Sequence, residues 1–357
     1  MQSLTFRVLV VLVALVSALP AFSQKLITFD APTAGTSSGT GTQPVAINFF
    51  GTITGIVVDK DQVWRGFVRN PDGSGTAFEA PGADHYLGCT CPMAINDEGV
   101  IIGIVSDANG VYHGFIRKPN GKITVFDVPG TDLYVFPLSI SDDGTVVGYY
   151  FDFYGIEHAF LRTPSGKITE FQDPSGTILT EATRPDSINN FGVIAGIVED
   201  TAPQGLNHGF LRSRKGQYTH FDVPGAIYRH VSDAYVNDLG AVAGTYIAQQ
   251  ATDHAVVAGY TRSPDGTITT FASPTGSLKN LFVYGLNLQG TVVGAFERAD
   301  IDEDHAFVRY ANGRMVAPLF PPEEIQSVSL GINASGTVVG WWQDSQPVTH
   351  GFILSPR

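Results

Sequence analysis

Residues 96–103 read NDEGVIIG, and the pattern that they carry, Asn/Ser-x-x-Gly-x-x-x-Gly, recurs along the whole chain. Its copies are spaced at intervals of 48, 45, 48, 48, 50 and 46 residues, and they begin at Asn48, Asn96, Ser141, Asn189, Asn237, Asn287 and Asn333. Self-similarity at this period is typical of stacked or radially arranged supersecondary units. The sequence therefore predicts a repeat architecture with one structural unit for each copy.

The second unit shows what each repeat contains. Residues 96–99 form a tight turn, because Asn and Asp side chains bond their own backbone and Gly accepts positive φ. Gly103 lies inside a strand, where glycine usually marks a bulge or a close backbone approach. Four strands are expected, the first ending with residues 93–95 and the others over 100–105, 112–117 and 122–126. Four antiparallel strands in about 48 residues describe a propeller blade.

The two ends of the chain favour a closed ring. The seventh unit stops after its third strand, at residues 351–354, and a matching fourth strand stands at residues 25–30. Pairing these segments would remove two exposed sheet edges. An open solenoid, the rival architecture, would need polar caps, and none is visible. We therefore predict an all-β fold, a seven-bladed β-propeller whose N-terminal strand completes the last blade.

Two further marks accompany the motif. A Phe-x-x-Pro element recurs at Phe29, Phe78, Phe126, Phe171, Phe221 and Phe271, and a His-Gly/Ala-Phe triad recurs at His113, His158, His208, His305 and His350. Together with segments such as 158–162 and 121–127, these repeats resemble the bacterial HAF extracellular repeat family over nearly the whole mature chain. The resemblance implies a secreted repeat protein and no agreed biochemical activity. The first and fifth units depart from it, with Arg65 and Ala258 in place of the His.

The first 23 residues are predicted to be a secretory signal peptide. Arg7 gives the positive start, residues 8–19 form an apolar run too short for a stable membrane anchor, and residues 21–23 offer a cleavage site. No Cys follows the run, so a lipoprotein anchor is not expected. We predict that residues 24–357 form a single propeller domain that is exported, extracellular or periplasmic, and monomeric.

The net charge of the mature chain argues against two classes of partner. Removing Arg7 leaves 20 basic against 34 acidic residues, a net charge of −14. Nucleic acid and anionic membranes both require clustered Lys and Arg, so neither is expected as a partner. An extracellular glycan or protein remains the predicted ligand.

The two cysteines stand as Cys89-Thr90-Cys91. Export favours their oxidation. Two residues apart in an extended strand, however, they lie near the outer limit of disulfide geometry. A Cys-x-Cys bridge and two buried thiols are therefore both open, and no metal partners stand nearby.

The recurring His is predicted to be structural. In three units an Asp precedes it by six residues, as in Asp107 with His113, Asp152 with His158 and Asp344 with His350. A carboxylate can orient an imidazole for catalysis or metal binding. One copy in each blade disperses these pairs around a ring, however, whereas an enzyme needs one convergent site. We expect the His to be buried, with its polar atoms satisfied.

The sixth unit carries alternate carboxylates at Asp300, Asp302 and Asp304. Such a spacing suits a hard cation such as Ca²⁺. His305 stands where a calcium loop has its turn glycine, and no bidentate Glu follows at a suitable distance. A solvated acidic loop is the alternative, and no cofactor is required by any other motif.

The predicted ligand site is the mouth of the central channel, because the segments entering the inner strands vary where the rest of the repeat is uniform. Its candidate residues are Tyr134, Arg184, Asp186, His230 and Asp233. Aromatic faces beside Arg, His and carboxylates suit a sugar or a small anionic ligand. A wet polar channel without a dedicated ligand is the alternative.

These observations favour a secreted binding or interaction scaffold that recognises an extracellular polymer or protein through the loop-rich face. The enzyme alternative is a lyase or hydrolase acting on a carbohydrate or small substrate at the channel mouth. In that case Arg184 would neutralise developing charge, His230 would act as general acid or base, and Tyr134 would exchange a proton. An enzyme would bring these groups to one shared point, whereas a scaffold would scatter them.

Overall fold

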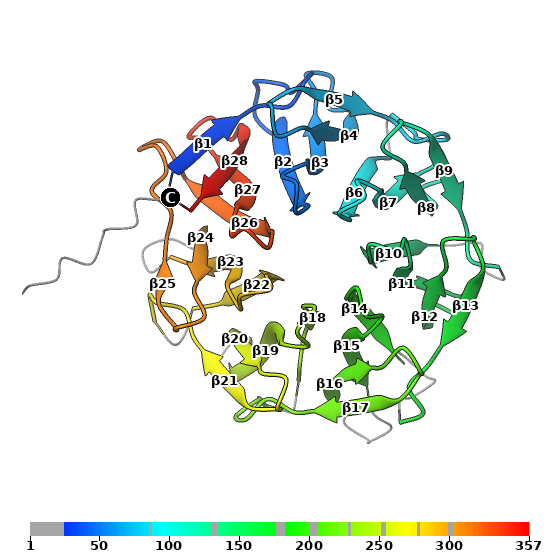
Figure 1. Cartoon of the computed structure of the whole chain (residues 1–357). Coiled ribbons are helices and arrows are strands. Elements are labelled where there is room, and N and C mark those ends of the chain that lie inside the picture. Colours follow the sequence, from blue (N-terminus) through cyan, green and yellow to red (C-terminus); the bar gives the residue numbers. More distant parts are fainter. Residues whose placement is uncertain are drawn as a thin grey trace, which may run out of the picture.

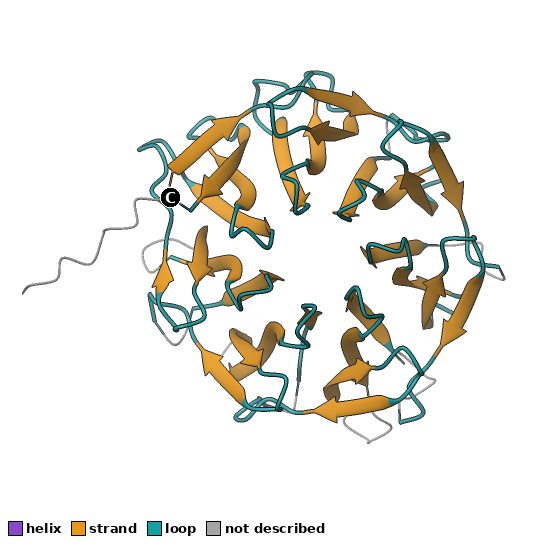
Figure 2. Cartoon of the chain, in the orientation of Figure 1, coloured by secondary structure: helices purple, strands orange, loops and turns teal. Residues whose placement is uncertain are grey.

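The computed structural model describes residues 25–85, 88–129, 134–175, 183–199, 206–227, 230–250, 255–276, 279–298 and 303–356. The predicted signal peptide lies outside these residues. Within them the regular elements are β-strands, grouped into sheets that surround a central axis like the blades of a propeller (Figures 1 and 2). The predicted all-β propeller fold is thus confirmed. No helix in the described part is long and apolar enough to cross a membrane.

The strands occupy four positions, counted outward from the axis. The innermost strands are β2 (Gly41–Ile47), β6 (Thr90–Ile95), β10 (Val135–Ile140), β14 (Arg184–Ile188), β18 (Tyr235–Val236), β22 (Leu281–Leu286) and β26 (Gln326–Ile332). The second strands are β3 (Ile53–Val58), β7 (Ile101–Ser106), β11 (Val146–Phe151), β15 (Ile194–Glu199), β19 (Val242–Gln250), β23 (Val292–Glu297) and β27 (Val338–Gln343).

The third strands are β4 (Trp64–Arg69), β8 (Tyr112–Arg117), β12 (Glu157–Arg162), β16 (Asn207–Arg212), β20 (Ala255–Arg262), β24 (Asp304–Arg309) and β28 (Thr349–Ser355). The outer strands are β5 (Gly75–Phe78), β9 (Ile123–Phe126), β13 (Ile168–Phe171), β17 (Tyr218–Phe221), β21 (Ile268–Phe271), β25 (Met315–Val316) and β1 (Lys25–Phe29). In the second unit the expected strands agree with β6 to β9 to within three residues at each end.

The N-terminal strand pairs where the sequence placed it. β1 runs antiparallel to β28, in register from Lys25 with Ser355 to Phe29 with Gly351. Five sheets are four-stranded, and a sixth has eight strands, ordered β26-β27-β28-β2-β3-β4-β5 with β1 on β28. Its two halves are joined by one parallel bridge, between Gly41 and Thr349. The described residues therefore form six hydrogen-bonded sheets and not seven separate ones, because this bridge merges two of the expected units.

The two glycines of the motif have different roles, which the second unit illustrates. Gly99 has φ 74°, the left-handed conformation that the turn requires. Only Gly fits at position 103, because a Cβ there would collide with the carbonyl oxygen of Cys91 in the neighbouring inner strand. That strand is bulged between Pro92 and Ala94, which brings its backbone close to β7. The close approach is thus confirmed, and the bulge lies on the partner strand.

The motif Asn side chains link the units into a ring. The Nδ2 of Asn48 donates to the carbonyl oxygen of Asn96, and Asn333 donates across the chain ends to the carbonyl oxygen of Asn48 at 3.0 Å. Equivalent bonds are made by Asn96, Asn189, Asn237 and Asn287. Each Oδ1 also accepts from its own turn, as Asn237 does from Ala241 at 3.0 Å. These buried amides therefore close the turns and join neighbouring units at the same time.

The Phe-x-x-Pro and His-Gly/Ala-Phe elements pack on each other. The ring of Phe126 in β9 fills the space that a Cβ on Gly114 would need, and Arg162 of the next unit covers this ring at 4.9 Å. An Arg also covers the ring in five other units, the pairs being Phe29 with Arg69, Phe78 with Arg117, Phe171 with Arg212, Phe221 with Arg262 and Phe271 with Arg309. The Phe of the triad, for example Phe115, is fully buried between sheets. The recurring marks are therefore the core of the repeat.

Candidate functional site

The strand connections divide the molecule into two faces. In an antiparallel sheet, successive connections alternate between the two ends of the strands. The motif turns lie at one end, which we name the motif face. The connections between second and third strands, such as 59–63, 107–111 and 152–156, and the connections between units lie at the other end, which we name the loop face. All five residues predicted at the channel mouth stand on or next to connections at the loop face.

Arg184 and Asp186 form an ion pair at the start of β14. The Nε of Arg184 donates to Asp186 Oδ1 at 3.0 Å, and its Nη2 donates to the carbonyl oxygen of Ser232 in the next unit at 2.6 Å. Asp186 stands at the bulge of β14 and accepts the backbone N–H of Ala234 at 2.9 Å. Burial alone lowers the pKa of Arg184, but Asp186 and Glu157 outweigh it, so the pKa of Arg184 is raised. The pair therefore joins two neighbouring units.

Asp233 completes this cluster. Burial, together with the nearby charge of Asp186, raises the pKa of Asp233 to about 7. Its Oδ1 accepts the N–H of Thr245 at 2.8 Å, and its backbone carbonyl accepts the hydroxyl of Tyr260 at 2.9 Å. Burial also raises the pKa of Asp186, although Arg184 opposes the shift. Two carboxyl groups and one guanidinium thus share a desolvated corner of the channel.

The channel beside Asp186 contains a cavity of about 260 Å³. Its lining takes one residue from the inner strand of each unit: Val45, Met93, Leu138, Asp186, Tyr235, Tyr284 and Leu330. Six of the seven stand at the bulge of their strand, the exception being Tyr235. The bulges therefore aim one side chain from each of these units at the axis. Four of the seven side chains are aliphatic, so the lining of this cavity is largely apolar.

Tyr134 lies in a different group of side chains, among the aromatic rings of β8, β10 and β11. Its ring centroid is 5.1 Å from that of Tyr112 and 6.5 Å from that of Phe136. Phe136 in turn stacks on Tyr149 at 4.9 Å and contacts Phe151 at 6.2 Å. Tyr134 is 38 % exposed at the loop face. We name Tyr112, Tyr134, Phe136, Tyr149 and Phe151 the aromatic cluster.

The structure brings together three of the five predicted channel residues: Arg184, Asp186 and Asp233. His230 is held by its backbone, since its carbonyl accepts the N–H of Ile247 at 2.9 Å. This bond holds the backbone of His230 beside β19. His230 also stands only a few residues before Asp233 in the sequence. A shared reaction point for Tyr134, Arg184 and His230 remains a prediction.

The repeated His residues join loops to strands, as predicted. Nδ1 of His113 lies 2.6 Å from Asp127, and Nε2 lies 3.7 Å from Asp107. Nδ1 of His350 lies 3.0 Å from Asp30 of the N-terminal segment. The His side chains are half-buried instead of buried, because they lie at the loop face. Each pair is confined to one unit or one closure, which is what a structural role requires.

The proposed calcium ligands Asp300 and Asp302 lie outside the described residues. Asp304 begins β24 and is half-buried. Burial raises its pKa, with Glu297 and Glu303 adding to the shift. Among the described residues, no group of three or more His, Cys, Asp or Glu side chains could hold a metal ion. Calcium binding at this loop stays a prediction.

A groove that was not predicted from the sequence opens at the loop face between β4 and β8. It has a volume of about 400 Å³ and is lined by Gln62, Trp64, His85, Gly88, Cys89, Ser106 and Tyr112. Cys89 and Cys91 are joined in a disulfide, the oxidised alternative of the two left open by the sequence. The sequence signals of this groove were departures from the repeat: Arg65 in place of the His, and the two cysteines.

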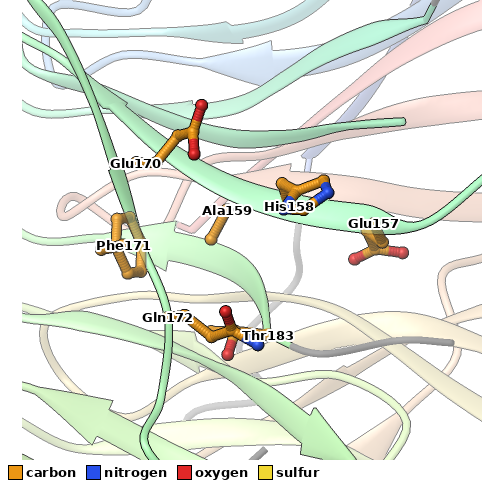
Figure 3. A pocket seen from close by; sticks show the side chains of 7 residues that line it. All are labelled: Glu157, His158, Ala159, Glu170, Phe171, Gln172 and Thr183. Atoms are coloured by element: carbon orange, nitrogen blue, oxygen red, sulfur yellow. The ribbon is translucent and has the colours of Figure 1, made fainter. Parts of the chain in front are cut away.

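A smaller cavity of about 160 Å³ lies between β12, β13 and the start of β14 (Figure 3). Glu157, His158 and Glu170 line it, together with Phe171 and Thr183. Glu170 Oε1 accepts the hydroxyl of Tyr150 at 2.7 Å, and Nε2 of His158 lies 3.1 Å from Asp152. Glu170 and His158, two of the polar side chains at this cavity, are therefore already bound to groups of their own unit.

At the motif face, the turns surround a cavity of about 240 Å³. Asp97, Asp142 and Asp238 stand on its rim, and each accepts a backbone N–H from the preceding turn. Burial raises the pKa of Asp97, and the charges of Asp142 and Asp238 add to the shift. These contacts reinforce the ring of Asn side chains at this end of the axis.

Comparisons with known proteins give the fold and no family. No protein family and no curated protein matches the sequence. Among solved structures, a virginiamycin B lyase of Staphylococcus aureus is similar, with a TM-score of 0.60 and 15% identity over 94% of this chain and 100% of that one. A streptogramin B lyase follows, with a TM-score of 0.58 and 14% identity over 93% and 98% of the two chains. A prolyl endopeptidase gives a TM-score of 0.54 and 10% identity over 90% of this chain and 46% of that one. At these identities the likeness concerns the fold alone.

Proposed function

We propose that this protein is a secreted binding scaffold that recognises an extracellular polymer or protein through its loop face. The observation that carries the proposal is the aromatic cluster, five touching rings that end at the loop face in the exposed ring of Tyr134. Such rings offer a rigid apolar surface with a polar edge, which suits contact with an extended ligand. Phe153 and Tyr154, in the next loop of the same face, add two more exposed rings.

We infer that the scaffold is a seven-bladed propeller, with the eight-stranded sheet serving as two blades. Seven motif copies follow each other in one ring of hydrogen bonds, and Ser141 is the only one without the amide link. Only the single bridge at Gly41 joins the two halves of this sheet, whereas neighbouring strands within each half pair over six residues. The HAF resemblance, the predicted signal peptide and the Cys89–Cys91 disulfide support export, since disulfides persist in oxidising compartments.

The second candidate is a lyase or hydrolase activity at the channel mouth. The observation that favours it is Asp233, whose pKa of about 7 would suit a general acid or base near neutral pH. Known lyases share the fold, although at an identity that transfers no activity. Arg184 argues against this candidate, because its guanidinium is already bound by Asp186 and by Ser232. A catalytic arginine would instead be directed at substrate.

Retention on immobilised polymers tests the proposal. The mature protein is passed through gels containing a β-1,4-glucan, a mannan, a galactan or polygalacturonate, or over immobilised extracellular matrix protein, and retardation is measured. Tyr134→Ala should weaken retention at least tenfold. Phe191→Ala is the matched control, because Phe191 is 63% exposed but stands on the motif face. Equal loss in both variants, or no retention of the wild type on any of these ligands, would refute a binding role for the loop face.

A further inference from the structure

We propose that the groove between Trp64 and Tyr112 binds one uncharged hexose residue of a polysaccharide. This inference rests on the proposed binding function and names its ligand class and its principal contact. At about 400 Å³ the groove falls within the range of roughly 300–1,000 Å³ typical of small-molecule sites. A single sugar ring with its hydration partly removed fits this space.

Two equivalent strand ends form the walls of the groove. Trp64 and Tyr112 are the first residues of β4 and β8, so they occupy the same position in neighbouring units. The backbone of Trp64 also forms a parallel bridge with Cys89, at the start of the next inner strand. Because Cys89 is tied to Cys91, the bridge fixes the Trp64 backbone against a constrained segment. The indole is 40 % exposed although its backbone is fixed, which is the condition of a preorganised stacking surface.

The aromatic surface continues beyond the groove. Tyr112 contacts Tyr134 at 5.1 Å and Phe136 at 5.7 Å, so the groove opens directly onto the aromatic cluster. The apolar faces of a hexose pack on aromatic rings while its hydroxyls remain available for hydrogen bonds. A sugar in the groove would therefore place the adjoining sugars of its chain over Tyr134. This continuity favours a polymer over a free monosaccharide.

Polar groups at the groove are held in place by an ion-pair network specific to the first unit. Arg65 donates to both Asp59 and Glu79, and Glu79 Oε2 lies 3.0 Å from Nε2 of His85. Burial opposes the shift, but the hydrogen bonds of Arg65 and His85 hold the pKa of Glu79 below its usual value. Gln62 and Ser106 supply further hydrogen-bonding groups at the lining.

The charge of the lining selects the ligand. None of the seven lining residues is an Asp, Glu, Lys or Arg, and Nε2 of the one His among them, His85, faces Glu79. A uronate or an amino sugar would lose hydration here without meeting an opposite charge. Arg65 and Glu79 are paired with each other beside the groove. An uncharged hexose needs only stacking and neutral hydrogen bonds, so it is the ligand that loses the least hydration free energy on entering the groove.

Departures from the repeat also concentrate at this groove. Arg65 replaces the recurring His, and Glu79 replaces the Asp that bonds His113 and His350 in their units. The only two cysteines of the chain stand at the same place. Each change is unnecessary for the blade core, because the other units build that core without it. Their convergence on one groove indicates a specialised unit.

Tryptophan fluorescence tests the inference with few confounding signals. The chain has three Trp residues: Trp64 is 40 % exposed, Trp341 is half-buried, and Trp342 is buried, at 5% exposure. We expect a neutral polysaccharide, chosen from a β-1,4-glucan, a mannan and a galactan, to shift the emission of the wild type. Trp64→Phe should abolish the shift while gel retention stays within threefold, because a phenyl ring still stacks. Trp64→Ala, with unchanged circular dichroism, should weaken retention at least tenfold.

The outcomes separate this inference from the function on which it rests. Retention that Tyr134→Ala weakens and Trp64→Ala leaves within twofold would overturn the groove and leave the binding face intact. A fluorescence shift that persists in Trp64→Phe would also overturn it. Binding confined to polygalacturonate or to matrix protein would refute the uncharged sugar. Failure of the wild type to bind any of the ligands would refute the proposed function itself.

Discussion

Replacing Phe29 by Ala tests whether the N-terminal strand closes the ring. The Phe29 ring fills the space over Gly351, meets Phe67 edge to face at 6.3 Å and is covered by Arg69 at 4.8 Å. Truncating a buried Phe costs about 3–5 kcal/mol. The ring of Phe29 is half-buried, so the lower end applies. We expect the free energy of unfolding to fall by about 3 kcal/mol.

Phe126→Ala supplies the calibration. Phe126 stands at the same position of an internal unit, with Phe160 at 6.3 Å and Arg162 at 4.9 Å. Its strand follows β8 of the same sheet through a short turn, whereas β1 reaches β28 only by strand pairing, because the two lie at opposite ends of the chain. Urea unfolding at equilibrium measures both variants. A loss within about 0.5 kcal/mol for Phe29→Ala beside a full loss for Phe126→Ala would show that the ring stays closed without β1.

Three further predictions concern the ring, the channel and the acidic loop. Asn237→Ala removes a bond to Asn287 and two turn bonds and should lower the free energy of unfolding by about 2–3 kcal/mol, whereas Asn237→Ser should lose less, because Ser141 fills the same position; equal losses in a urea titration would contradict this. The pKa of Asp233 rises from 3.8 to about 7, so its protonated form adds stability that is fully present below pH 4 and is lost as the pH rises through 7. Asp233→Asn should therefore gain stability relative to the wild type between pH 5 and 8, and a constant difference across that range would exclude the shift. If the loop at Asp302 binds Ca²⁺, millimolar Ca²⁺ should raise the melting temperature of the wild type and not of Asp302→Ala; an unchanged wild-type Tm would leave the loop a solvated turn.

The fold could be predicted from the sequence because the residues that pack each repeat recur at fixed positions. Gly103 and Gly114 are visible as glycines, and their partners, the Cys91 carbonyl and the Phe126 ring, follow from strand pairing. The closure by residues 25–30 could be read from the strand missing at the other end. The merging of two units through Gly41 and Thr349 could not be predicted, since a single backbone bridge requires no particular pattern of side chains.

The candidate sites were only partly accessible to such reasoning. Arg184, Asp186 and Asp233 could be selected because they break a uniform repeat, and the structure unites them. The place of Tyr134 among the rings of three strands depended on how β8 and β10 pack, so its partners were not foreseen. The expected burial of the His residues was wrong, because their strand position at the loop face leaves one side in water.

The sequence alone thus determined the repeat, the strand order and the closing segment, since local turn chemistry and side-chain size act within one unit or between adjacent ones. Only the tertiary structure decided which departures from the repeat meet in space. Trp64, His85 and Tyr112 belong to separate segments, and they share a groove because Trp64 pairs with Cys89 across two units. Such a contact depends on the angle between neighbouring sheets, which arises from the packing of the whole ring.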